Sequence, residues 1–266
     1  MFPRQLAAFL SCILLASSSL SARQSSTSQQ GPALLQRAQA AMTRGAAVSE
    51  VTLTGTARRI AGSDDESGTA TLKALATGES RIDLNFPSGP RAEVRADSAD
   101  GPAGKWTAPD GTSHAIAQHN LHAGNSWFFL PFTLASVLSA SDSVVSGIGH
   151  ETFDGTAVEH ISISRQFTSL SADAHTTALF QHLSQMELYL DSTTLLPVAL
   201  TFNTHPDNNA LLDIPVIIRY SDYKTVNGTQ IPFHIQKFIN NSLVLDLQFQ
   251  SATFNSGLSV SDLSVQ

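Results

Sequence analysis

Histidine is the residue type in this chain that most readily suggests chemistry, because imidazole can bind a metal ion or carry a proton near neutral pH. The chain has nine histidines. Zinc sites usually show closely paired ligands, often cysteines, and a helical pair of histidines needs a spacing of four residues. The candidate ligands are His114, His119 and His122 in one short stretch, and Glu151, Glu159 and His160 farther along.

The spacing of these candidates does not fit a metal site. His114 and His119 are five residues apart across an expected turn, and the chain has no His-Glu-x-x-His motif. His150-Glu151 and Glu159-His160 are pairs of neighbours, and neighbouring side chains on a strand point to opposite faces. We therefore expect surface histidines and no metal site.

Nucleophilic catalysis and phosphate binding also lack their usual motifs. There is no Gly-x-Ser-x-Gly sequence, and the single cysteine, Cys12, lies in the apolar N-terminal stretch. Asp64, Asp65 and Glu66 cluster in an expected exposed turn, where solvation accounts for them. No glycine-rich loop follows a strand and opens a helix, as phosphate binding requires. We expect no catalytic residues and no cofactor, with a dispersed active site left open as an alternative.

One long apolar segment is the remaining candidate for a site. Residues 125–141 carry no charge, and Pro131 is suited to begin a short helix at about residues 132–140. The segment is interpreted in two ways, as a core helix packed on a sheet or as a lid over an apolar cavity that accepts acyl chains. The predicted ligand-binding residues are Trp127, Phe128, Phe129, Leu130, Phe132, Leu134, Val137 and Leu138.

The N-terminus has the features of a secretory signal. Arg4 precedes an apolar run over residues 6–20, which is shorter than the roughly 20 residues of a membrane span. Cleavage near Ser21 or Ala22 gives a signal peptide over 1–22, a flexible polar leader over 23–30 and one domain over 31–266. Such a protein is periplasmic or secreted, and its mature part has no cysteine, so its core alone must stabilise it.

Charge narrows the class of partner. Lys and Arg number 15 against 22 Asp and Glu, a formal charge of −7, whereas nucleic-acid binders need clustered positive charge. We therefore expect no nucleic-acid partner. Beyond the signal there is no second apolar span, so contact with a membrane would be peripheral.

Hydrophobic periodicity predicts an α+β fold that is mainly antiparallel β. A helical pattern runs over residues 32–44 and ends at Gly45, and a further helix is expected over 172–184. Between and after them lie about twelve short strands. The last of these alternate clearly and are separated by Asn227-Gly228 and Asn240-Asn241, which suit two-residue hairpin turns. So many strands favour a curled sheet or unclosed β-barrel, with two or three helices plugging its concave face.

These features together resemble the LolA-like superfamily of bacterial envelope proteins. The resemblance rests on the signal, the helix with LLQRAQAAM at 34–42 and the long antiparallel run. It also rests on Tyr220, Tyr223, Asn227-Gly228 and Ile231-Pro232, followed by the Asn-x-Gly-Leu of residues 255–258. The resemblance implies an unclosed β-barrel whose helices cover a hydrophobic cavity.

The function that the resemblance implies is binding rather than catalysis. We expect a non-enzymatic periplasmic module that holds a lipid, or the acyl chains of a lipoprotein, in an apolar cavity. The alternative is an envelope interaction or regulatory module with a filled core, which binds another envelope protein and no lipid. The functional arginine of the lipoprotein carriers has no match in this chain.

Overall fold

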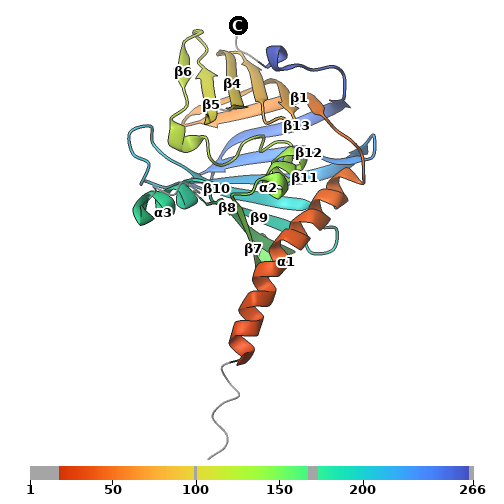
Figure 1. Cartoon of the computed structure of the whole chain (residues 1–266). Coiled ribbons are helices and arrows are strands. Elements are labelled where there is room, and N and C mark those ends of the chain that lie inside the picture. Colours follow the sequence, from red (N-terminus) through yellow and green to blue (C-terminus); the bar gives the residue numbers. More distant parts are fainter. Residues whose placement is uncertain (1–17, 99–100, 167–172, 264–266) are drawn as a thin grey trace, which may run out of the picture.

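The structure, a computed structural model, describes residues 18–98, 101–166 and 173–263. Within these ranges one antiparallel sheet of thirteen strands has the order β6-β5-β4-β3-β2-β1-β13-β12-β11-β10-β9-β8-β7. The sheet curls without closing, as predicted (Figure 1). Its strands are β1 (Glu50–Ala61), β2 (Asp64–Leu75), β3 (Ser80–Phe86), β4 (Gly89–Ser98), β5 (Gly101–Thr107), β6 (Ser113–Ala115), β7 (Ser143–Phe153), β8 (Thr156–Arg165), β9 (Met186–Asp191), β10 (Pro197–Thr204), β11 (Ile214–Val226), β12 (Thr229–Ile239) and β13 (Ser242–Phe254).

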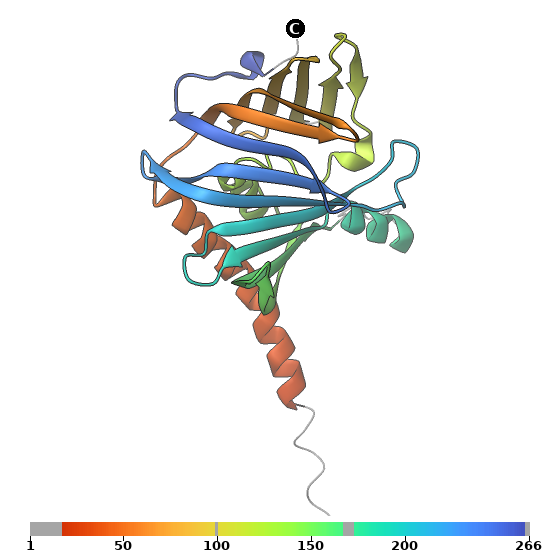
Figure 2. The same cartoon turned by 180° about the vertical axis from the view of Figure 1, so that it is seen from behind.

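Three α-helices accompany the sheet. They are α1 (Ser18–Thr43), α2 (Leu130–Ser139) and α3 (Ala174–Leu183), and two short 3₁₀ helices lie at η1 (Gln118–Asn120) and η2 (Val260–Asp262). α1 and α2 lie on the concave side, α3 stands beside one end of the strands, and the first part of α1 extends away from the sheet (Figure 1). Seen from behind, the convex face of β10 to β13 has no helix in front of it (Figure 2). In the described part of the chain, no helix combines the length and the apolar character of a membrane span.

α1 differs from the expected helix at its beginning. The sequence pattern placed its start at Pro32, but the helix begins at Ser18 and includes residues 23–30, which we expected to be flexible. Gln and Arg are good helix formers, and only Thr27 in that stretch is β-branched, so the backbone can continue in helical form. The end is as predicted, since Gly45 follows the helix with a φ of 81°.

The acidic residues 64–66 were expected in a turn, and this prediction is wrong. The turn is confined to Gly62 and Ser63, and β2 begins at Asp64. Asp65 and Glu66 are strand residues that form cross-strand ion pairs with Arg58 and Arg59 of β1. Charge pairing across the ladder, rather than solvation alone, explains the cluster.

The hairpin turns follow the predicted chemistry. Asn227 and Gly228 have φ values of 48° and 87°, and Asn240 and Asn241 have 49° and 61°, the left-handed values that a two-residue hairpin turn requires. Because the turns fix the register, Ile231 and Ile235 of β12 are fully buried on the concave face together with Leu247 of β13. The apolar face expected from the closing strands is therefore the inside of the curled sheet.

α1 covers that inside with one face. Leu35, Ala38 and Met42, at spacings of three and four, are buried in the core. Near the start of this face, Gly31 approaches β7 so closely that a Cβ atom there would lie 2.7 Å from the backbone nitrogen of Gly147. The absence of a side chain thus lets the helix dock against the edge strand.

The motif Tyr220-x-x-Tyr223 depends on an irregular backbone at Asp222. Residues three apart in a regular strand point to opposite faces. The pairing of β11 with β12 is interrupted at Asp222, which has a φ of 52°, and resumes in the same register at Tyr223, and both tyrosines pack against the core. Tyr220 donates a 2.7 Å hydrogen bond to the carbonyl of Trp127, and Tyr223 donates one of the same length to Pro197.

The Asn-x-Gly-Leu motif fastens the end of the last strand to the start of the first. Asn255 accepts a hydrogen bond from the Ser49 backbone N–H and donates one to the carbonyl of Ala47, each of 2.9 Å. The backbone N–H of Gly257 donates to the carboxylate of the buried Glu50 at 3.0 Å. These bonds reinforce the pairing of β1 with β13 in the middle of the sheet.

Candidate functional site

The apolar segment identified from the sequence lies under the concave face. Pro131 stands in the first turn of α2, as predicted, and Phe129 precedes the helix as its N-cap residue. Phe129 and Phe132 pack edge to face with ring centroids 4.6 Å apart. Six of the eight predicted residues are buried and two are partly buried: Trp127, Phe128, Phe129, Leu130, Phe132 and Leu134 belong to the first group, Val137 and Leu138 to the second.

Side chains fill the space between this segment, α1 and β11, whereas a pocket of about 140 Å³ on its other side is lined in part by Phe132 and Val137. The pocket between α1, α2 and β11 is lined by Met42, Phe129, Leu130 and the two tyrosines, and its volume is about 10 Å³. That is about the space of one water molecule, too little for a ligand. In this conformation the segment is therefore part of the core, and the two interpretations, core or lid, differ only in whether it moves.

An open groove lies farther along the concave face. It has a volume of about 580 Å³ and runs between the ends of β1, β3 and β4 on one side and the β12–β13 hairpin on the other. Its wall is apolar at Leu84, Ile239, Leu243 and Leu245. A pocket of about 250 Å³ adjoins it, shares Leu84 and Leu245, and reaches Trp127, the one predicted residue that borders the groove.

Three cations stand among these apolar residues. Arg59 pairs with Glu66 at 3.2 Å, and Lys237 places its ammonium 5.5 Å from the centre of the Trp127 ring. Arg91 has a buried Nε that contacts no hydrogen-bond partner within the described ranges. A buried guanidinium nitrogen without a partner is uncommon and indicates a position that a ligand can complete.

Lys237 is held in an unfavourable setting for a cation. Burial lowers the pKa of its ammonium, Glu93 raises it, and Arg95 lowers it further, so the pKa lies below its usual value. Burial raises the pKa of the Glu93 carboxyl, but the charges of Arg95 and Lys237 outweigh this and hold the pKa low. Because Glu93 is bonded to Arg95 at 2.7 Å, its charge is shared, and Lys237 is only partly compensated.

A further pocket of about 480 Å³ lies on the convex side, between β4, β5 and the C-terminal η2 helix. Val94, Ala96, Val260 and Leu263 give it an apolar lining. Its lining also contains the cations Arg95 and Lys105 and the carboxylate of Glu79. It offers apolar surface, but its lining lacks the convergence of three cations that marks the concave groove.

The histidines that were considered as metal ligands from the sequence have different neighbours. His114 stacks on Trp106 with centroids 4.3 Å apart, His119 contacts the carbonyl of Pro206 at 3.1 Å, and His122 packs against Phe180. Each of these three histidines therefore has a local contact of its own.

The two His-Glu neighbour pairs on β7 and β8 instead pair with each other. His150 contacts Glu159 at 3.1 Å, and His160 contacts Glu151 at 2.8 Å, so the side chains alternate between faces as predicted. His160 also contacts Glu187 of β9 at 2.7 Å. The sequence could not show these pairs, because they depend on the register of three strands.

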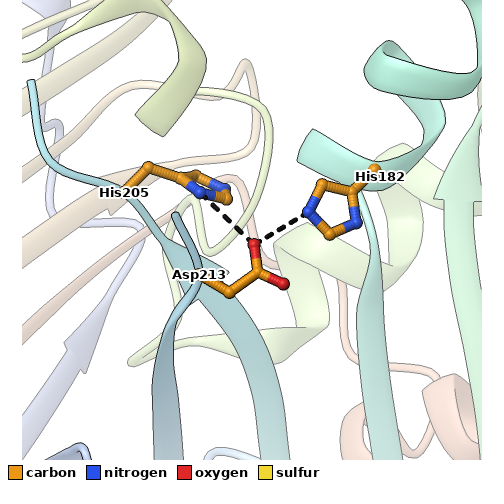
Figure 3. A group of neighbouring side chains, drawn as sticks. All are labelled: His182, His205 and Asp213. Atoms are coloured by element: carbon orange, nitrogen blue, oxygen red, sulfur yellow. Dashed lines mark hydrogen bonds and ion pairs between the residues drawn. The ribbon is translucent and has the colours of Figure 1, made fainter. Parts of the chain in front are cut away.

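A different histidine cluster was missed. His182 of α3, His205 at the end of β10 and Asp213 at the start of β11 bring their side chains together, and their potential ligand atoms lie within 4.8 Å of one another (Figure 3). No short-range spacing links these residues. The only available signal was that His205 and Asp213 flank a loop between two predicted strands and so return to the same end of the sheet.

Comparison with known proteins gives a match of fold alone. No model of a protein family matches the sequence. No curated protein matches it. Among solved structures, an outer membrane lipoprotein-sorting protein domain from Vibrio parahaemolyticus superposes with a TM-score of 0.57 at 12% identity, covering 89% of this chain and 97% of that one.

Two further structures agree with this match. A DUF1329 family protein from Desulfovibrio piger gives a TM-score of 0.60 at 11% identity, over 90% of this chain and 99% of that chain. A LolA superfamily protein from Nitrosomonas europaea gives 0.55 at 11% identity, over 90% and 98%. The chain therefore has the LolA-like fold, an unclosed antiparallel barrel with helices on its concave side.

Proposed function

We propose that this protein is a non-enzymatic periplasmic module that binds an acyl chain, from a lipid or a lipoprotein, in the groove on its concave face. The observation that carries the proposal is the groove itself, an apolar channel of about 580 Å³ with an adjoining pocket of about 250 Å³. The volume of the groove lies in the range of small-ligand sites, and the adjoining pocket enlarges it. The likeness in fold to a lipoprotein-sorting domain supports the same class of ligand.

The charges in the groove narrow the ligand to an amphiphile with an anionic group. Leu84 and Leu245 would hold the chain, while Arg91 and Lys237 would face its head. An anion there would give the buried Nε of Arg91 a partner and compensate the charge of Lys237. With a neutral lipid, the Arg91 Nε would still have no partner and the charge of Lys237 would still be only partly compensated.

The Trp127–Leu138 segment contributes to the proposal as a movable wall. Trp127 borders the adjoining pocket, so displacement of this segment would lengthen the groove toward the core. In this conformation the filled core limits the ligand to the open end. The protein could take up the ligand from a membrane through peripheral contact, without a segment that spans it.

The experiment is ligand binding by the mature chain. Native mass spectrometry of the purified protein and titration with a fluorescent fatty acid should both detect an acyl ligand. Leu84→Trp, which fills the groove, should abolish binding, and Lys237→Met should weaken the fatty acid at least about tenfold while sparing its uncharged methyl ester. Val94→Trp fills the convex pocket instead and serves as the control, with wild-type affinity.

The second candidate is an interaction module that binds another envelope protein. The filled space between α1, α2 and β11, only about 10 Å³, favours it. If no acyl ligand copurifies and the fluorescent fatty acid binds wild type and Leu84→Trp equally or not at all, the lipid proposal fails. Charge reversals on the exposed strands, with loss of a cellular phenotype, would then test the interaction module.

A further inference from the structure

Three side chains from separate elements converge beside the end of the sheet, away from the concave groove. His182 comes from the last turn of α3, and His205 and Asp213 follow β10 and precede β11, whose ends are paired through Thr204 and Ile214. Figure 3 shows the carboxylate of Asp213 between the two imidazoles. Since Asp213 and His205 lie beside paired strand ends, their relative positions are set by the sheet.

The three side chains lie close enough together to share a metal ion. His182 Nε2 lies 2.8 Å from Asp213 Oδ1, and His205 Nδ1 lies 3.5 Å from the same oxygen. A zinc ion held at about 2.0–2.2 Å by nitrogen and oxygen ligands keeps them roughly 3.3 Å apart in a tetrahedron. The three groups can therefore enclose an ion after small side-chain rotations.

His205 is placed as a ligand by its surroundings. Its backbone is clamped by Asn120, which accepts a hydrogen bond from His205 N–H and donates one to the His205 carbonyl, each of 2.8 Å. Asn120 also accepts a hydrogen bond from Thr204. Such bonds, made one step away from the ligands, are what orient the ligands of protein metal sites.

The imidazole of His205 has one nitrogen without a partner. Its side chain is 1% exposed, Nδ1 contacts the carbonyl of Leu212 at 3.2 Å, and the buried Nε2 has no hydrogen-bond partner in the described structure. Nδ1 is the ring nitrogen that lies near Asp213, at 3.5 Å, and it can bind an ion once it leaves the Leu212 carbonyl.

We propose that His182, His205 and Asp213 form a zinc site, with water as the fourth ligand, that ties α3 to the β10–β11 loop. Two imidazoles and a carboxylate suit zinc, whereas calcium and magnesium prefer oxygen ligands alone. His119, whose ring lies 5.9 Å from that of His205, is bonded to Pro206 and supports the loop. The proposal is independent of the acyl-chain groove.

The test uses the mature chain, without a histidine tag and freed of metal by EDTA. Titration calorimetry with zinc chloride should give one equivalent bound, and cobalt should give the visible absorption of a four-coordinate site. His182→Ala and Asp213→Asn should each weaken zinc at least about tenfold. His175→Ala removes an exposed histidine from the same helix and is the matched control, with unchanged affinity.

The same experiment needs a control which shows that the variants are folded. His182 and Asp213 are partly exposed, so their variants should keep the wild-type circular dichroism spectrum. His182→Gln is the milder variant, because its amide can still form hydrogen bonds but binds zinc poorly. Zinc should also slow hydrogen exchange of residues 174–183 in wild type and not in His182→Gln. Absence of saturable binding at micromolar zinc, or equal affinity in wild type, His182→Gln and Asp213→Asn, would overturn the proposal.

Discussion

Single residues in this protein depend on backbone irregularities for their roles. Tyr220 and Tyr223 share the interior although they are three residues apart, because the backbone between them is irregular at Asp222, which has a φ of 52°. Tyr220 then becomes the polar link between β11 and the Trp127 segment, through a fully buried hydrogen bond of 2.7 Å. If that segment moves to admit a ligand, this is the bond that must open.

Tyr220→Phe should therefore loosen the segment. Removing the hydroxyl leaves the Trp127 carbonyl without its donor, and we expect a loss of about 1–2 kcal/mol in unfolding free energy. Hydrogen exchange should accelerate in residues 127–138. Tyr223→Phe loses the bond to Pro197 and should show a similar loss of stability without faster exchange in that segment. Equal exchange in both variants would contradict a linking role for Tyr220.

Some residues of the candidate sites could be predicted from the sequence and others could not. Trp127 and its apolar neighbours formed one uncharged run that could be read directly. Arg59, Arg91 and Lys237 come from three strands and meet only when the sheet curls. The same holds for His182 and His205, since long-range pairing, and not local spacing, brings them together.

At the scale of elements, α1 depends on close contact with the edge strand β7. Its buried face was predictable from apolar spacing over residues 32–44, and so was its end at Gly45. Its beginning was not, because the polar residues before Pro32 have no apolar period to reveal a helix. The turns with Asn and Gly were predictable for a different reason, namely that few residues accept a positive φ.

The effect of Gly31→Ala on stability should show whether helix propensity or packing against β7 dominates at this position. In an exposed helix, glycine to alanine stabilises by about 1 kcal/mol. Here the added Cβ would lie 2.7 Å from Gly147 N, so Gly31→Ala should instead lower the melting temperature. Gln36→Ala, at an exposed position of α1, is the control and should leave it nearly unchanged. A stabilised Gly31→Ala variant would show that α1 is not held tightly against β7.

The whole molecule is organised around one ladder, in which the first strand pairs with the last. β1 and β13 lie in the middle of the sheet order, and the Asn255 and Glu50 hydrogen bonds secure their ends. The unclosed barrel could be predicted from the number of strands and the motifs. The strand order could not, because alternation shows which face is buried but not which strands are neighbours.

Asn255→Ala should test this closure. The substitution removes the bonds to Ser49 and Ala47 and places a Cβ-bearing residue without a polar side chain at a φ of 53°. We expect a loss of about 2 kcal/mol in denaturant unfolding. Asn255→Gly tolerates the positive φ and should lose less, which separates the bonds from the backbone strain. Wild-type stability in both variants would mean that the end of β13 is not held there.

The central β1–β13 ladder also bears on how the protein is made. All other neighbours in the sheet are consecutive strands, so they can pair as soon as each hairpin exists. β1 must wait with one edge unpaired until residues 242–254 have been synthesised, and an unpaired edge readily recruits other chains. An interrupted translation product would thus be an aggregation hazard and not a smaller folded unit, which makes a chaperone that holds the growing chain advantageous to this topology.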